Sequence, residues 1–127
     1  MTDLLAQEVN VSVISEYVAQ QSDPSLEKFV YQYTVTIANE GSHPVTILAR
    51  HWLITDGNGK LNEVQGDGVI GETPTIEAGD SFTYTSAAML ETQLGTMQGS
   101  YTAQGQNHVQ FKIPIPVFRL EVPGVVH

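Results

Sequence analysis

The chain has 127 residues and a formal net charge of −9, from 14 acidic and 5 basic side chains, and it contains no cysteine. That length suits a single domain with one hydrophobic core, spanning residues 1–127. The few, scattered basic side chains argue against binding to nucleic acid, whose backbone is recognised by clustered Lys and Arg. Without cysteine, the chain can form no disulfide, thiolate metal site or cysteine nucleophile.

No segment is typical of export or of membrane insertion. Residues 1–8 contain no basic region and no long apolar stretch. No later apolar run approaches the ~20 residues that a membrane-spanning helix needs. We therefore expect a cytoplasmic protein that makes no membrane contact.

Alternation of apolar and polar residues predicts strands along most of the chain. The first covers residues 8–18, with Val9, Val11 and Val13 on one face. The second, residues 27–38, has the clearest inward face, and we expect this face to dominate the buried core. Its side chains are Phe29, Tyr31, Tyr33, Val35 and Ile37.

The third predicted strand, residues 45–55, is apolar on both faces, which is typical of a central strand. Regular alternation places Trp52 on the same side as Arg50 and on the opposite side from Ile47. One of Arg50 and His51 then faces the core and needs a hydrogen-bonding partner there. We favour a structural role for that residue over a catalytic one.

Turn residues and shorter alternating segments complete the pattern. Residues 56–59, DGNG, predict a hairpin, and further strands are expected at residues 61–65 and 81–86, around Met97 to Tyr101, and at 108–122. Pro114 and Pro116 predict that the last strand lies at an edge or is bulged or broken. With no persuasive helix, about seven strands predict an all-β sandwich of two sheets.

Residues 66–71, GDGVIG, are the stretch that most resembles a functional motif. Their G-x-G-x-x-G spacing is that of a dinucleotide-binding turn, but such a turn must open a helix. Residues 72–80 contain turn formers and β-branched residues instead. We favour a loop between strands, in which Gly66 and Gly68 adopt backbone conformations closed to other residues, over an anion-binding loop.

Val69 and Ile70 are adjacent β-branched residues in this loop, so their side chains point in different directions. We expect one to pack beneath the loop and the other to remain exposed as an apolar anchor for a protein partner. The candidate binding residues are therefore Gly66, Asp67, Gly68, Val69, Ile70, Gly71 and Glu72.

Catalysis has little support in the sequence. Among the histidines, His51 and His108 lie on predicted strands, and no His-x-x-x-His or His-Glu-x-x-His spacing occurs. The sequence also lacks a strand-to-helix turn that could present a serine nucleophile. We expect a protein that is not an enzyme and that needs no cofactor.

Two binding alternatives stay open at the glycine loop. Neighbouring carboxylates could hold a divalent cation such as magnesium, which prefers oxygen ligands. The loop amides could instead hold a polyphosphate, although the carboxylates oppose that unless a magnesium ion bridges them. The carboxylates concerned are Asp56, Glu63, Asp67 and Glu72.

Ordered stretches over nearly the whole chain resemble the bacterial ApaG family. They are residues 21–24 (QSDP), 50–56 (RHWLITD), 66–74 (GDGVIGETP) with Val64, 84–86 (YTS), 95–101 (GTMQGSY) and 115–120 (IPVFRL). The chain departs from the family at Ala87, where glycine is usual, and at Ala103, where methionine is common. These departures affect only local turn geometry and packing.

The resemblance implies a single ApaG domain with an immunoglobulin-like or fibronectin type III-like sandwich. ApaG proteins are similar to domains of eukaryotic F-box proteins and of a polymerase-delta-interacting protein, which implies protein–protein interaction. The family is also linked to cobalt and magnesium resistance, and it brings no catalytic residue. The protein partner stays unknown, and a homodimer formed through a sheet edge stays open.

Overall fold

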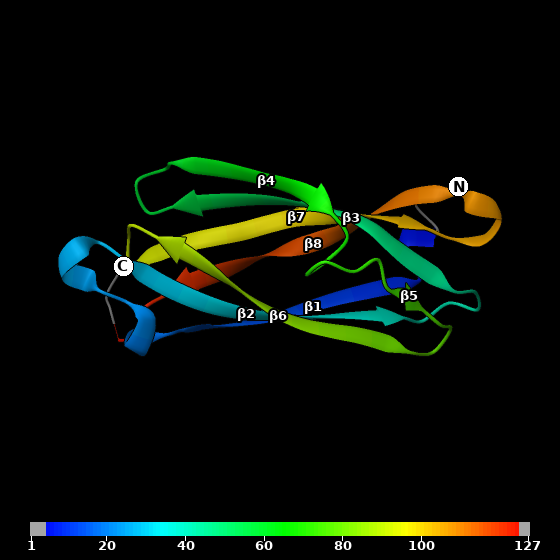
Figure 1. The fold of residues 1–127 in the computed structure, drawn as a ribbon, viewed down its shortest axis with the longest axis horizontal. Coiled ribbons are helices and arrows are strands. Elements are labelled where there is room, and N and C mark those ends of the chain that lie inside the picture. Colours follow the sequence, from blue (N-terminus) through cyan, green and yellow to red (C-terminus); the bar gives the residue numbers. More distant parts are fainter. Residues whose placement is uncertain (1–4, 125–127) are drawn as a thin grey trace.

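The computed structural model describes residues 5–124. In this part of the chain, strands form two antiparallel sheets that face each other (Figure 1), which confirms the predicted all-β sandwich. The three-stranded sheet has the order β1 (Val9–Tyr17), β2 (Phe29–Asn39), β6 (Ser81–Leu90). The five-stranded sheet has the order β4 (Leu61–Asp67), β3 (Val45–Asp56), β7 (Leu94–Gln104), β8 (Gln110–Glu121), and β5 (Thr75–Ile76) pairs with β3.

Three short 3₁₀ turns lie at Ala19–Gln21, Pro24–Leu26 and Gln106–His108, and Leu5 and Ala6 are also helical. None of the described helices has the length and apolar character needed to cross a membrane. His108 was expected on a strand, but it ends the third turn with a φ of 59°. Part of the expectation about export concerns residues 1–4, which lie outside the described residues.

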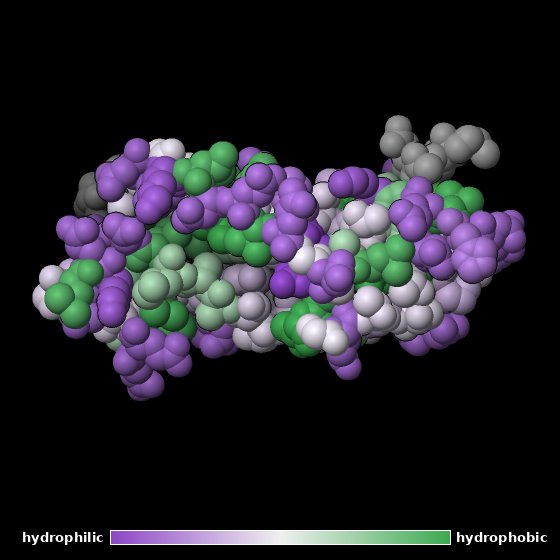
Figure 2. Space-filling view, turned by 45° about the horizontal axis from the view of Figure 1, so that its top comes forward, coloured by the Kyte–Doolittle hydropathy of each residue, from purple (hydrophilic) through white to green (hydrophobic). Residues whose placement is uncertain are grey.

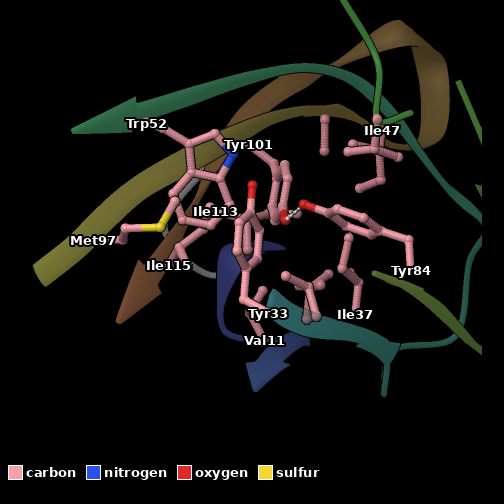
Figure 3. Close-up of a cluster of buried hydrophobic side chains, with 14 of the residues drawn as sticks. Val11, Tyr33, Ile37, Ile47, Trp52, Tyr84, Met97, Tyr101, Ile113 and Ile115 are labelled. Atoms are coloured by element: carbon pink, nitrogen blue, oxygen red, sulfur yellow. Dashed lines mark hydrogen bonds between the residues drawn. The ribbon is translucent and has the colours of Figure 1, made fainter. Parts of the chain in front are cut away.

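The predicted inward face of β2 is confirmed. Its five apolar side chains are between 0% and 6% exposed. Opposite them, Trp52 from β3 contacts the rings of Tyr33 and Phe118, with centroid distances of 5.4 and 5.9 Å. Figure 3 shows Tyr33 and Ile37 of one sheet and Trp52 and Tyr101 of the other among the buried side chains between the two layers. The core is therefore an aromatic cluster assembled from both layers.

A β-bulge interrupts β3. Ile47 pairs with Ala103, but Ala49 pairs with the next residue back along β7, Thr102, so Leu48 has no partner in the ladder. An extra residue of this kind reverses which side chains point to each face beyond it.

The predicted regular alternation of β3 is therefore wrong beyond Ile47. Ile47 and Trp52 both face the core, and they are 0% and 3% exposed. Because Arg50 lies two residues before Trp52, it shares the core side, and His51 points away from it. One of the two polar residues does face the core, as expected, and it is Arg50.

The C-terminal strand is an edge strand with a bulge, as its prolines predict. It pairs only with β7 in the described sheet, and the register shifts where Met97 pairs with Phe118 but Gly99 pairs with Ile115. The two residues between are Pro116 and Val117. β6 is longer than predicted, since it continues past Ser86 to Leu90.

Candidate functional site at the glycine hairpin

The glycine motif ends one strand and forms a tight hairpin, which we call the glycine hairpin (residues 66–72). The first two residues of the motif are the last two of β4. Val69 and Glu72 then exchange two backbone hydrogen bonds, of 2.8 and 2.9 Å. At the tip, Ile70 and Gly71 have φ values of 41° and 79°. Two positive φ values in succession are typical of a type I′ turn. The prediction of a loop between strands is confirmed.

Gly68 adopts the special backbone conformation that the sequence predicts. Its φ is +61°, and a Cβ there would lie 2.0 Å from the backbone oxygen of Glu72. Its amide donates a 2.6 Å hydrogen bond to the carbonyl of Leu48, the bulged residue of β3. This bond continues the register of β3 with β4 by one residue beyond the Ala49–Asp67 pair, and any side chain at Gly68 would disturb it.

Gly66 does not adopt such a conformation, so the expectation for this glycine is wrong. It lies in β4, opposite Arg50 in the register. A Cβ at Gly66 would come within 2.8 Å of the Arg50 guanidinium. A side chain at Gly66 would displace the guanidinium, which lies across the strand at this point.

Arg50 ties the base of the glycine hairpin to β3. Its Nη1 donates to the carbonyl oxygens of Asp67 and Gly68, at 2.8 and 3.2 Å. The core-side arginine thus has its partners in the backbone of the hairpin. Hydrogen bonds with a charged donor are stronger than neutral ones, so these contacts hold the hairpin in one position.

The two β-branched residues of the glycine hairpin separate as expected. Val69 is 0% exposed and belongs to the hydrophobic core, whereas Ile70 is 55% exposed. Ile70 is also unusual in its backbone, since a β-branched residue at positive φ is a rare and strained arrangement. The hairpin therefore presents an apolar side chain to solvent from a strained tip.

The outer face of the five-stranded sheet, beside the hairpin, has a polar hollow of about 410 Å³. It is lined by Ala49, Arg50, His51, Gln65, Gly66, Asp67, Thr102 and Lys112. At its margin, His51 Nε2 lies 2.5 Å from Glu63 Oε2, and Gln65 donates to the same oxygen at 3.3 Å. The hydrogen bonds from His51 and then Gln65 lower the pKa of Glu63. No serine lies within this lining, so it does not form a serine–histidine–carboxylate arrangement.

The four carboxylates proposed for a cation do not converge. Asp56 and Asp67 lie at opposite ends of the β3–β4 hairpin, about 20 Å apart at a strand rise of ~3.3 Å per residue. Glu63 is engaged by His51. Among residues 5–124, no three His, Asp or Glu side chains lie close enough to hold an ion.

The backbone of the hairpin is also occupied where a phosphate would need it. The amides of Gly68, Val69 and Glu72 donate to backbone carbonyls. An anion-binding nest requires successive amides that are free to point at the ligand. This arrangement gives the polyphosphate alternative no support.

The fold and the site define a class: a two-sheet β-sandwich in which an arginine on β3 holds the glycine hairpin at the end of the neighbouring strand, β4. The sequence profile of the ApaG domain matches residues 19–105. The chain belongs to the ApaG domain family, as its sequence indicates.

Its relatives match over nearly their whole length. The chain is 52% identical to Protein ApaG of Pectobacterium atrosepticum, with 96% of this chain and 98% of that protein covered. It is 53% identical to Protein ApaG of Escherichia coli O139:H28, with 94% and 95% covered. The crystal structure of the putative ApaA protein from Bordetella pertussis has a TM-score of 0.90 at 46% identity, covering 92% of this chain and 95% of that one.

A more distant structure shares the fold alone. The C-terminal domain of wzt has a TM-score of 0.56 at 12% identity, covering 94% of this chain and 75% of that one. The finer likeness to a fibronectin type III domain stays a prediction.

Proposed function

We propose that this ApaG-domain chain is a non-enzymatic protein–protein interaction module, in which Ile70 is the apolar anchor for a cytoplasmic protein partner. One observation carries the proposal: Ile70 is 55% exposed at a φ of 41°, while the adjacent Val69 is fully buried. The buried Val69 thus fixes the hairpin against the core, and the exposed Ile70 makes its tip apolar.

The backbone strain at Ile70 supports a role in binding. A side chain with a Cβ in the left-handed region costs about 1–2 kcal/mol, and such strain concentrates at functional sites. It persists here because Arg50 and the Gly68–Leu48 hydrogen bond hold the hairpin base. A rigid apolar anchor loses little entropy on binding, which favours affinity.

The surroundings of Ile70 indicate the chemistry of the partner. Asp67 and Glu72 flank the tip, and Val64 on the preceding strand is 40% exposed. Figure 2 shows hydrophobic and hydrophilic surface interspersed on this side of the molecule. A partner with an apolar pocket and a basic rim would complement this surface.

The link between the ApaG family and cobalt or magnesium resistance would then act through the partner. The carboxylates near the hairpin are too far apart, or already paired, to hold one ion between them. The module would influence cation levels by binding a protein.

The test replaces Ile70 with a residue that suits its backbone better. Ile70→Asn should stabilise the fold slightly, by up to about 1 kcal/mol, because Asn tolerates positive φ. It should also abolish capture of the proteins that immobilised wild-type chain retains from cytoplasmic extract. Ile14→Asn is the matched control, since Ile14 is 76% exposed on β1. It should leave capture intact.

Two outcomes would overturn the proposal. If Ile70→Asn retains the same proteins as the wild type, the hairpin is only a connection between strands. If pyrophosphate with magnesium causes saturable amide shifts confined to residues 66–72 at micromolar concentration, the site binds polyphosphate.

A further inference from the structure

The edge strands of the two sheets differ in how they are protected from pairing with another chain. An exposed edge offers unpaired backbone groups, and proteins block such edges with prolines, bulges, charges or covering segments. β8 has both Pro114 and Pro116 and a bulge. β4 has the carboxylates of Glu63 and Asp67, with Lys60 just before it.

The edge at β1 is protected in a different way. Ser15 of β1 donates a 2.7 Å hydrogen bond to the carbonyl of Arg119 in β8. β8 therefore lies beside β1, and β1 also carries the charge of Glu16. Three edges thus have at least one protective feature each.

β6 has none of these features. Its ten residues, SFTYTSAAML, include no charged residue, proline or glycine. Its register with β2 is unbroken from Ser81 to Leu90, so it is not bulged. In the described sheet it pairs with β2 on one side and with no strand on the other. β6 is therefore a long, regular and uncharged edge.

The outer face of the three-stranded sheet continues this uncharged surface up to the β6 edge. Thr34 and Thr85 share a hydroxyl hydrogen bond of 2.9 Å, and Thr36 and Thr83 share one of 3.1 Å. Each pair belongs to a row of side chains that lie opposite one another on neighbouring strands, and each row ends at β6. An added strand would extend both rows through side chains directly opposite the threonines.

We propose that two copies of this chain associate by antiparallel pairing of β6 with β6 about a two-fold axis, which doubles the three-stranded sheet. In such an interface, residues near the axis face their own counterparts. In a chain of net charge −9, most edges would then bring like charges together. Pairing β4 with its own copy would bring carboxylates close to each other. Pairing β8 with its own copy would be interrupted by its prolines. β6 alone among the four edges brings no charge to the axis.

The side chains of β6 suit this arrangement. Outward residues must oppose outward residues for the sheet to continue, so a register centred on Thr85 places Thr85 opposite its own copy. The same register places Thr83 opposite Ala87, and Met89, which is 62% exposed, opposite Ser81. All of these side chains are uncharged, and most are small. The assembly would also carry two copies of Ile70, which strengthens binding to a multivalent partner.

Sedimentation and light scattering across a range of protein concentrations test the proposal. The wild type should show a concentration-dependent dimer. Thr85→Lys should weaken the dimer by about tenfold or more, because it opposes two like charges. Two controls should leave the dimer intact: Thr85→Val, which removes the hydroxyl without adding charge, and Ser12→Lys, which adds the same charge to the outer face of β1.

Mixing variants provides a test of the register. Thr85→Lys and Thr85→Glu should each form a weaker dimer than the wild type, but the two variants combined should form a tighter dimer than either alone, because opposite charges then meet at the axis. A wild type that stays monomeric at all concentrations, or a Thr85→Lys dimer as tight as the wild type, would overturn the proposal. Ile70 lies outside β6, so loss of the dimer and loss of partner capture are separate results.

Discussion

The aromatic core and the glycine hairpin are stabilised in contrasting ways, although both depend on β3. In the core, Trp52 contacts the rings of Tyr33, Tyr101 and Phe118, and Tyr33 and Phe118 also contact each other. In the hairpin, position depends on a few single contacts, chiefly those made by Arg50 and Gly68. The comparison shows that one strand can stabilise two regions in different ways. Trp52 makes many packing contacts in the core, and Arg50, two residues earlier, makes a few specific hydrogen bonds to the hairpin.

The largest expected effect is in the core. Trp52→Ala should lower the free energy of unfolding by about 3–5 kcal/mol, because it leaves a cavity between the two sheets. Val64→Ala, at the position paired with Trp52 on β4 and 40% exposed, is the control and should cost much less. Denaturant unfolding measures both. Similar values for the two variants would show that Trp52 is not central to the core.

A smaller effect is expected from the hairpin. Gly68→Ala should cost about 1–3 kcal/mol, because a Cβ there meets the backbone of Glu72 as well as requiring positive φ. Gly71→Ala is the matched control. Its φ is +79°, yet no atom lies within 4 Å of the position of its Cβ. The difference between the two variants measures the steric contact alone, and equal costs would contradict the close approach seen at Gly68.

The smallest expected effect concerns hydroxyl groups within the core. Tyr84 and Tyr101 share a buried hydrogen bond, visible as the dashed line in Figure 3. Burial raises the pKa of Tyr84 from 10.0 to about 12 and raises the pKa of Tyr101 as well. Tyr84→Phe should cost about 1 kcal/mol at pH 7, because Tyr101 loses this partner.

The pKa shift of Tyr84 also predicts a dependence on pH. Between pH 10 and about 12 the unfolded chain loses this proton while the folded chain keeps it. The corresponding stability is fully present below pH 10 and is lost as pH rises through about 12. Tyr84→Phe should therefore show a shallower loss of stability over this range, measured by unfolding at several pH values. An unchanged slope would count against the raised pKa.

Local pattern determined much of this protein. The strict alternation along residues 29–37 predicted the inward face of β2, because side chains alternate between the faces of any strand. The lack of a helical pattern after residue 71 excluded a dinucleotide-binding turn. Adjacency alone predicted that Val69 and Ile70 would separate into one buried and one exposed residue. Each of these inferences depends on residues that are close in sequence.

Tertiary structure decided that Val69 rather than Ile70 was buried. It also decided which face of β3 carries Arg50 and what lies against Gly66. The bulge at Leu48 arises in the pairing of β3 with β7, two strands that are far apart in the sequence. That bulge moves Trp52 to the side of Ile47 and turns Arg50 towards the core. Gly66 then leaves room for the guanidinium of a residue on the neighbouring strand. These outcomes depend on contacts between distant segments, whose geometry a period of two residues does not encode.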